Sequence, residues 1–375
     1  MKYLLISIIF ILSVNFLNCS FQSILFSRMA KEKKGENLII SPLSIFQALS
    51  LAANGAKGQT QSEMLELLQS NTIEELNKIN YDIISAFKEF STIDIANAVM
   101  TKFTPLEDFI SISEKYLAPI EPLVSVEQVN NWCSNKTHGK IDKILDFLDD
   151  YTLMIILNAV YFKGEWISKF VPEITKKLPF YNLGSEEISI DTMTQISHFQ
   201  YYEDKKVQAI ELKFLEDFMS AIIILPAEGT DINKYIDSLS LSNDEYSKIL
   251  DGLNYVKVHL QLPKFELEFK EKLNQVLSDL GMYNAFSEYE ADFTGLRSKG
   301  ELYISQVIHK TYLKVFEDGC EAAAVTAIDI ATNSIPVEEK IYDMKINRPF
   351  LFLLKNSKLP KGYDLVFMSK IEKLG

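Results

Sequence analysis

Glu317-Asp-Gly-Cys-Glu-Ala-Ala-Ala-Val-Thr-Ala-Ile-Asp-Ile330 is the stretch that decides how this chain is interpreted. Counted at period two, as in a β-strand, one face carries only small or apolar side chains, at positions 320, 322, 324, 326, 328 and 330. Such a face could enter the middle of a sheet, and Gly319 lets the backbone bend at its base. An alanine-rich run is also typical of a short helix, so the flanking sequence has to decide.

The composition is that of a folded globular protein. The chain has 375 residues, of which 47% are hydrophobic and 24% charged. Length alone suggests two or three domains, but no Pro/Gly/Ser-rich linker, repeat or low-complexity tract divides the chain, which favours one domain. The net charge of -13 argues against nucleic acid as a partner. The basic cluster at residues 31–34 is interpreted as a solvated helix end rather than a heparin site.

The amino terminus has the pattern of an export signal. Lys2 precedes an apolar run over residues 4–14, which is shorter than the roughly 20 residues that span a bilayer. We therefore predict a signal peptide over 1–19, a single mature domain over 20–375, and an extracellular protein without a membrane anchor. The alternative is that this run forms a buried first helix. Asn135-Lys-Thr137 is a sequon, so Asn135 is predicted to carry a glycan.

The search for catalytic chemistry finds no enzyme motif. The sequence lacks a phosphate-binding loop, a dinucleotide-binding glycine pattern and a Gly-x-Ser-x-Gly turn. The four histidines are scattered without a zinc-binding spacing, and Cys133 with His138 is interpreted as structural. We predict no enzyme activity, no cofactor and no metal. Cys133 and Cys320 remain once Cys19 leaves with the signal, too few for a disulfide framework.

Periodicity predicts a mixed α and β chain. Ser41 and Pro42 form a good helix start, a capping hydroxyl followed by a proline in the first turn. Expected helices are 44–53, 62–68, 72–90 and 125–134. Expected strands are 153–162, 219–225, 256–262, 265–269, 350–354 and 365–371, the first being of the fully buried kind.

Several motifs in order along the chain resemble one family, the serpins. They cover essentially the whole mature chain: Asn37–Ile45, Leu157–Trp166, Leu262–Phe265, Ala291–Gly295, Asn347–Phe352 and Phe367–Ile371. The resemblance implies an α+β serpin fold with three β-sheets and about eight or nine helices. It also implies an exposed reactive-centre loop at about residues 317–340.

The resemblance assigns roles to matching residues. Those of the hinge, which would insert into the main sheet, are Glu317, Gly319, Cys320, Glu321, Ala322, Ala323, Ala324 and Thr326. Asp318 and Cys320 depart from the usual residues at their positions, but Cys is small and tolerates burial. Asn333 is the seventeenth residue from Glu317, which places the reactive bond at Asn333-Ser334. The cluster that lets the sheet open would be Ser41, Ser44, Asn158 and His309, with Trp166 at the top of the sheet.

The implied function is that of a secreted inhibitor acting as a suicide substrate. A protease would attack Asn333 of the inhibitor and become acylated. Insertion of the hinge into the main sheet of the monomeric inhibitor would then trap the protease in a covalent complex. The absence of Lys and Arg between Phe316 and Lys340 disfavours trypsin-like targets. A serine endopeptidase that prefers small or uncharged residues ranks first. The alternatives are an asparagine-specific cysteine endopeptidase as target, or a non-inhibitory serpin acting as carrier or chaperone. Oxidation of Cys320 that blocks insertion is a further hypothesis.

Overall fold

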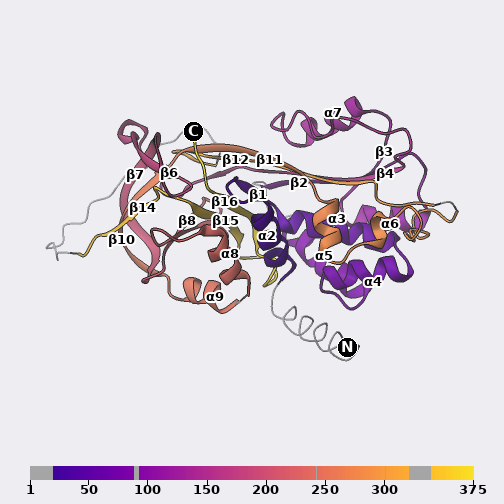
Figure 1. Ribbon diagram of the computed structural model, residues 1–375, viewed down its shortest axis with the longest axis horizontal. Helices are drawn as coiled ribbons and strands as arrows, with labels where there is room; N and C mark the ends of the chain where they lie inside the picture. Colours follow the sequence, from indigo (N-terminus) through magenta and orange to yellow (C-terminus); the bar gives the residue numbers. More distant parts are fainter. Residues whose placement is uncertain (1–19, 88–92, 242, 300, 321–338) are drawn as a thin grey trace.

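The computed structural model describes residues 20–375 except 88–92, 242, 300 and 321–338 (Figure 1). In that part of the chain, strands form three hydrogen-bonded sheets and helices gather mainly toward one end. The nine α-helices of the described ranges are α2 (Phe21–Glu32), α3 (Pro42–Gly55), α4 (Gly58–Leu67), α5 (Ile73–Phe87), α6 (Glu107–Lys115), α7 (Val126–Lys136), α8 (Ile232–Leu241), α9 (Asn243–Asp251) and α10 (Asn274–Asp279). The predicted α+β class is confirmed.

The described strands alternate with these helices along the chain. In order they are β1 (Leu38–Ile40), β2 (Ile93–Thr101), β3 (Ile120–Pro122), β4 (Met154–Phe162), β5 (Gly164–Glu165), β6 (Lys176–Asn182), β7 (Glu186–Glu203), β8 (Val207–Lys213), β9 (Met219–Pro226), β10 (Asn254–Pro263), β11 (Phe265–Lys272), β12 (Gln306–Val315), β13 (Gly319–Cys320), β14 (Tyr342–Lys345), β15 (Phe350–Asn356) and β16 (Leu365–Ile371). Two 3₁₀ turns, Pro172–Ile174 and Asn284–Phe286, are also present.

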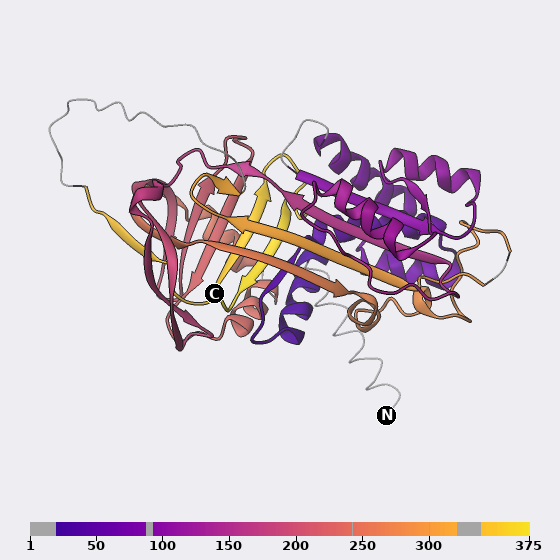
Figure 2. The same cartoon turned by 90° about the horizontal axis from the view of Figure 1, so that it is seen from above.

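The five-stranded sheet has the order β11-β12-β4-β2-β3. Its central strands β12 and β4 are parallel and pair from Gln306↔Ile155 to Tyr312↔Tyr161. Helix α7 lies over one face and α3 to α6 lie beneath the other (Figures 1 and 2). All nine residues of β4 are buried, as expected for an apolar run covered on both sides. A strand inserted between β12 and β4 would therefore enter the interior of the molecule.

Helix α3 forms the core beneath that sheet. The Ser41 hydroxyl accepts the Ser44 amide, and Pro42 occupies the first turn, where no intrahelical amide bond is lost. All its 14 residues are buried. The helix was predicted over 44–53 and is two residues longer at each end, starting at Pro42 directly after the capping Ser41.

The other sequence predictions fall on observed elements with shifted ends. The helix expected at 62–68 begins at Gly58, and that at 125–134 runs over Val126–Lys136. The helix expected at 72–90 spans Ile73–Phe87, beyond which residues 88–92 lie outside the described part. Helix α2 was not predicted apart from its basic end, where Lys31 lies in the last turn and Lys33 caps it.

The nine-stranded sheet runs β1-β16-β15-β9-β8-β7-β10-β14, with β6 paired to β7. Strand β14 is an edge strand, parallel to β10. It begins soon after residues 321–338, so the chain leaves β12 on one sheet and resumes on the edge of another. Both ends of the predicted reactive loop are therefore anchored in sheets.

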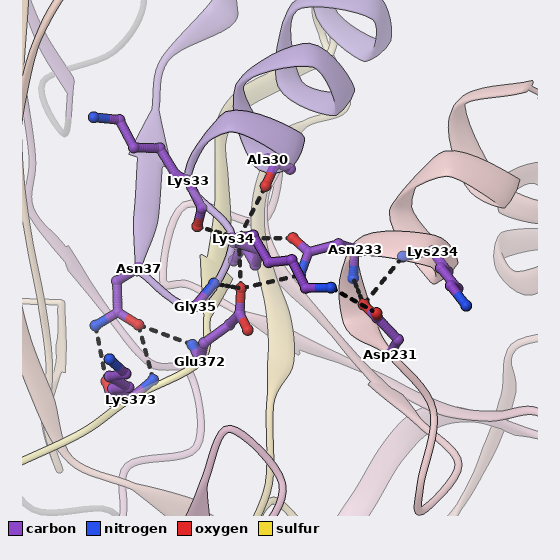
Figure 3. A network of polar contacts seen from close by, with 11 residues as sticks. Ala30, Lys33, Lys34, Gly35, Asn37, Asp231, Asn233, Lys234, Glu372 and Lys373 are labelled. Carbon is purple, nitrogen blue, oxygen red and sulfur yellow. Dashed lines mark hydrogen bonds and ion pairs between the residues drawn. The ribbon is translucent and has the colours of Figure 1, made fainter.

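A buried polar network joins both ends of the sequence (Figure 3). The Lys370 ammonium is fully buried and donates to the carbonyls of Ala30 and Lys33 at 3.2 and 2.8 Å. It also donates to Asn233 Oδ1 at 2.8 Å and pairs with Glu372 at 2.5 Å. Lys370 thus caps the last turn of α2 and links it to α8 and β16.

Candidate functional site

The predicted hinge begins with a tight turn at the end of β12. Phe316 and Gly319 exchange both backbone hydrogen bonds, at 3.0 and 3.1 Å, with Glu317 and Asp318 between them. Gly319 has a φ of +149°, and a Cβ there would lie 2.1 Å from the Gly164 carbonyl oxygen. The turn therefore requires glycine at this position.

After the turn the chain runs back along the top of the five-stranded sheet. Gly319 lies opposite Glu165 and Cys320 lies opposite Gly164 in the antiparallel pair β13·β5. On its other side Gly319 bridges to Phe316. The first two hinge residues after the turn thus already occupy the place between the end of β12 and β5.

Cys320 is fully buried at this position. Burial raises the pKa of its thiol well above the ordinary value, so the sulfur stays protonated. A buried neutral thiol reacts slowly with oxidants, because the thiolate is the reactive form. This conformation therefore gives no support to the hypothesis of a redox switch at Cys320.

Trp166 packs at the hinge turn and hydrogen-bonds to it. Its indole is 1% exposed and stacks on Phe214, with ring centroids 4.4 Å apart. Its Nε1 donates to the Phe316 carbonyl at 3.1 Å, and its amide donates to the Asp318 carbonyl at 2.9 Å. The side chain predicted to lie at the top of the sheet is therefore bonded directly to the hinge turn.

Glu317 is held by three groups that the sequence did not identify. Its carboxylate accepts from Lys264 at 2.9 and 3.0 Å and from the Thr175 hydroxyl at 2.8 Å. Its carbonyl accepts the Phe170 amide at 2.9 Å. Burial raises the pKa of Glu317, but the bonds from Lys264 and Thr175 outweigh burial and hold that pKa below its usual value.

Asp318 belongs to a second ionic cluster. The Lys169 ammonium lies 2.7 Å from Glu165 and 3.6 Å from Asp318. Glu165 is on β5, so Lys169 connects the hinge turn to the strand that β13 pairs with. The hydrogen bond that Lys169 donates to Glu165 is the main cause of a raised Lys169 pKa. The acidic residue that departs from the family pattern thus has a basic partner of its own.

The predicted sheet-opening residues lie together beneath the same sheet. Asn158 on β4 donates to Ser44 on α3 and to Asn97 on β2, and His309 on β12 contacts its side-chain oxygen. The Ser41 amide donates to His309 Nε2 at 3.1 Å. Because Asn158 lies opposite both Asn97 and His309 in register, the cluster forms a polar row across β2, β4 and β12.

These contacts fix the protonation state of His309. Its Nε2 accepts from a backbone amide, so the proton of the neutral ring is on Nδ1 and is donated to Asn158. Burial lowers the pKa of His309 to about 3. A charged ring would direct an N–H at the Ser41 amide, so the cluster is built for the neutral form. Separation of β12 from β4 would break the His309–Asn158 bond.

Several predicted site residues lie outside the described part of the chain. These are the reactive bond Asn333-Ser334 and the hinge residues Glu321, Ala322, Ala323, Ala324 and Thr326. The residues missed by sequence reasoning are Lys264, Thr175, Lys169 and Asn97. Only Asn97 had a local signal, since it is a polar residue between Ile95 and Val99 on the face of an apolar strand.

The remaining predicted positions lie on or near α7. Cys133 is buried, and burial raises its thiol pKa to about 12, which fits the structural interpretation of Cys133 and His138. Asn135 is exposed, whereas the sequon's Thr137 is buried and donates to the Cys133 carbonyl at 2.9 Å.

Among the described residues, no group of three or more His, Cys, Asp or Glu is placed to hold a metal ion. No helix in the described ranges has the length and apolar character needed to cross a bilayer.

Comparison with known proteins agrees with this geometry. The family model of the serpins (serine protease inhibitors) matches residues 17–373. Iripin-2 of Ixodes ricinus is 33% identical over 359 residues, covering 90% of this chain and 88% of that protein. Leukocyte elastase inhibitor of Xenopus tropicalis is 30% identical over 353 residues, covering 89% and 93% respectively.

A solved structure agrees as well. The thermophilic serpin Tengpin in its native state superimposes with a TM-score of 0.84 at 31% identity, covering 96% of this chain and 94% of that one. The chain therefore has the fold of a native serpin. This chain belongs to the serpin family.

Proposed function

We propose that this protein is a secreted inhibitor that traps an endopeptidase by inserting its cleaved loop into the five-stranded sheet. It would act as a one-use substrate and not as an enzyme. The protease would attack the carbonyl of Asn333, release the amine of Ser334 and remain esterified or thioesterified to Asn333. Glu321 to Thr326 would then follow Cys320 into the sheet as a new strand between β12 and β4.

The observation that carries this proposal is the pairing of Gly319 and Cys320 with β5. The turn has already reversed the chain, so further residues would run antiparallel to both β12 and β4. One parallel ladder would be replaced by two antiparallel ladders, which are slightly more stable per residue. About a dozen additional backbone bonds at roughly 0.5–1.5 kcal/mol each supply on the order of 10 kcal/mol.

The polar row beneath the sheet supports the same proposal. Separating β12 from β4 would break the hydrogen bond between His309 and Asn158. Asn158 would keep its bond to Ser44, and polar groups of an inserted strand could replace the bond that is lost. An apolar seam would offer no such exchange. Ser41, Ser44, Asn158 and His309 are therefore proposed to control opening, and Trp166 to hold the turn where insertion begins.

The proposed target is a serine endopeptidase that accepts small or uncharged residues. This preference fits the name of one relative, the leukocyte elastase inhibitor of Xenopus tropicalis. Asn333 itself would suit an asparagine-specific cysteine endopeptidase, which is the alternative target. The other alternative is a carrier or chaperone, which would not need a hinge able to insert. The hinge sequence favours the inhibitor, because Cys320 to Ile330 contain no proline and no charge at the alternate positions that would face inward.

Incubation with a pancreatic elastase and with an asparaginyl endopeptidase tests the proposal. Denaturing electrophoresis should show a covalent complex, and sequencing of the released fragment should begin at Ser334. The cleaved protein should also unfold at a higher temperature than the intact one. Clean cleavage without a covalent band across these proteases, together with an unchanged unfolding temperature, would contradict trapping.

Export and glycosylation are part of the same proposal. Residues 1–19 are proposed to be removed as a signal peptide, leaving one serpin domain over 20–375. Because the Thr137 hydroxyl is bonded within the fold, Asn135 would have to be glycosylated before α7 closes. Expression in a secreting eukaryotic cell should yield a protein that starts near Ser20 and loses mass on enzymatic deglycosylation. An Asn135→Gln variant should show no such loss.

A further inference from the structure

Strand β14 attaches the chain to the nine-stranded sheet just after residues 321–338 (Figure 1). It spans four residues, Tyr342–Lys345, and lies at the end of the strand order, where it pairs with β10 along one side. Of its four side chains only that of Met344 is buried. A short edge strand with one buried side chain has little local stability of its own, so single side-chain contacts to it carry weight.

Two histidines on the neighbouring strands bind carboxylates of this segment. His259 on β10 contacts Asp343 Oδ1 through Nδ1 at 2.7 Å. His198 on β7 contacts Glu339 Oε1 through Nε2 at 2.8 Å. Lys257 lies opposite His198 in register, and His259 follows two residues later on β10, so both imidazoles are on the same face of the sheet. Two of the four histidines in the chain therefore bind the same short segment.

The strength of both contacts depends on the charge of the ring. At these distances a ring N–H lies between the nitrogen and the carboxylate oxygen, in the neutral ring as well as in the cation. A second proton makes the bond charge-assisted, which is roughly twice as strong as a neutral one. The side chains of His198 and His259 are 40% and 27% exposed, so protons from the solvent reach both. Imidazole is the side chain that changes charge between about pH 5 and pH 8.

Other titratable groups surround the two histidines. They are Tyr255 and Lys257 of β10, Glu211 and Lys213 of β8, and Lys345 of β14. The lysines disfavour a cationic ring and reduce the effect of a proton, whereas the carboxylates of Glu339 and Asp343 favour the cation. Side chains of the lysine, glutamate and tyrosine types keep their charge between about pH 5.5 and pH 8. The change of charge in this range therefore falls on the imidazoles.

We propose that His198 and His259 form a proton-dependent latch that holds β14, and with it the far end of the predicted reactive loop, on the sheet. Detachment of β14 would take Asp343 and Glu339 away from the rings, so the attached strand favours the charged imidazoles. Attachment is therefore tightest below about pH 6 and weakens as the pH rises toward about 8. The inference goes beyond the proposed function, because it concerns the intact protein and requires neither cleavage nor a protease.

Hydrogen exchange of the intact protein at pH 5.5 and at pH 8 tests the latch. The reporters are the amides of β14 and the amide of Ile346, which donates to the Gln261 carbonyl of β10 at 2.9 Å. Their protection factors, which divide out the intrinsic pH dependence of exchange, should fall about fourfold from pH 5.5 to pH 8, as expected for two partly exposed ion pairs. Strand β6 pairs with β7 away from both histidines and is the internal reference, with an expected change of less than about 1.5-fold.

Two double variants remove the latch from either side. His198→Gln with His259→Gln keeps an N–H donor at each position without the charge, and should reduce the change at β14 to less than about 1.5-fold. Glu339→Gln with Asp343→Asn removes the carboxylates, leaves both imidazoles in place and should have the same effect. The matched control is His138→Gln just beyond α7, which should keep the fourfold change.

Equal protection factors of β14 at the two pH values in the wild type would overturn the inference. A fourfold change that persists in either double variant would do the same, because the charge would then act through other groups. An equal change in β6 would also contradict it, since the whole sheet and not β14 would be opening. Failure of the protein to trap a protease would leave these measurements unaffected, so the latch and the proposed function are tested separately.

Discussion

Cys320 lies directly opposite Gly164, with its side chain fully buried at the top of the five-stranded sheet. A larger residue than glycine is excluded at Gly164, since a Cβ there would be 2.7 Å from the Phe162 ring and 2.8 Å from the Phe214 ring. The pair therefore combines a small strand residue with a small hinge residue. Because Cys320 is fully buried, a larger side chain there would have to displace its neighbours.

Replacing Cys320 with glutamate should abolish trapping while cleavage continues. A carboxylate at this position has no described cationic partner in contact with it, and an unpaired charge is costly to bury. The first inserted residue would be expelled, so the stoichiometry of inhibition should rise at least tenfold. The conservative variant Cys320→Ser should remain within twofold of the wild type. Equal stoichiometry for Cys320→Glu and Cys320→Ser would show that this position does not enter the sheet.

Removing the charge of Lys169 should loosen the hinge turn. Lys169 is 16% exposed and joins Asp318 to Glu165, and partly exposed ion pairs contribute up to about 1 kcal/mol. In Lys169→Gln, hydrogen exchange of the Gly319 and Trp166 amides should become about threefold faster. Lys177→Gln, which removes an exposed pair with Asp191, is the control and should not change these two amides. Unchanged exchange in Lys169→Gln would mean that the ion pairs of Lys169 do not stabilise the turn.

The neutral state of His309 should make the fold sensitive to acid. Burial lowers the pKa of His309 from 6.5 to about 3, so between these values the unfolded chain binds a proton that the folded chain does not. Stability from this group is therefore complete above pH 6.5 and is lost as the pH falls toward 3. The slope contributed is at most about 1.4 kcal/mol per pH unit.

The difference between wild type and His309→Gln isolates this contribution. Urea unfolding midpoints measured from pH 7 to pH 4 should fall more steeply in the wild type than in the variant. The carboxylates titrate in both proteins, so their contribution to the pH dependence of stability cancels in the comparison. Parallel pH profiles would contradict a buried neutral imidazole at this place in the sheet.

Breaking the Lys370–Glu372 pair should destabilise the whole domain. Removing one member leaves the other buried without its partner, which costs about 3–5 kcal/mol. Lys370→Met should therefore lower the free energy of unfolding by that amount in urea. The double variant Lys370→Met with Glu372→Gln should recover much of the loss, whereas Lys373→Met at an exposed neighbouring position should have little effect. Equal losses in the single and double variants would show that Lys370 acts through its carbonyl contacts instead.

The sequence predicted the buried strand β4, the start of α3 and the closing strands β15 and β16, because local periodicity and a helix cap determine these elements. The family resemblance supplied the arrangement of the sheets and the grouping of Ser41, Ser44, Asn158 and His309. Neither source predicted that Lys264 and Thr175 would hold Glu317. These side chains are 53 and 142 residues away from Glu317 along the chain, and no local pattern marks such a meeting.

The position of Lys370 has a consequence for biosynthesis. The carbonyl of Ala30 that it caps lies 340 residues earlier in the chain. A nascent chain on the ribosome can form helices and pair its early strands, yet the carbonyls of Ala30 and Lys33 lack this ammonium donor until Lys370 has been translated and has left the exit tunnel. This network therefore forms among the last events of folding. A truncation before residue 370 would remove the contacts that join α2, α8 and β16.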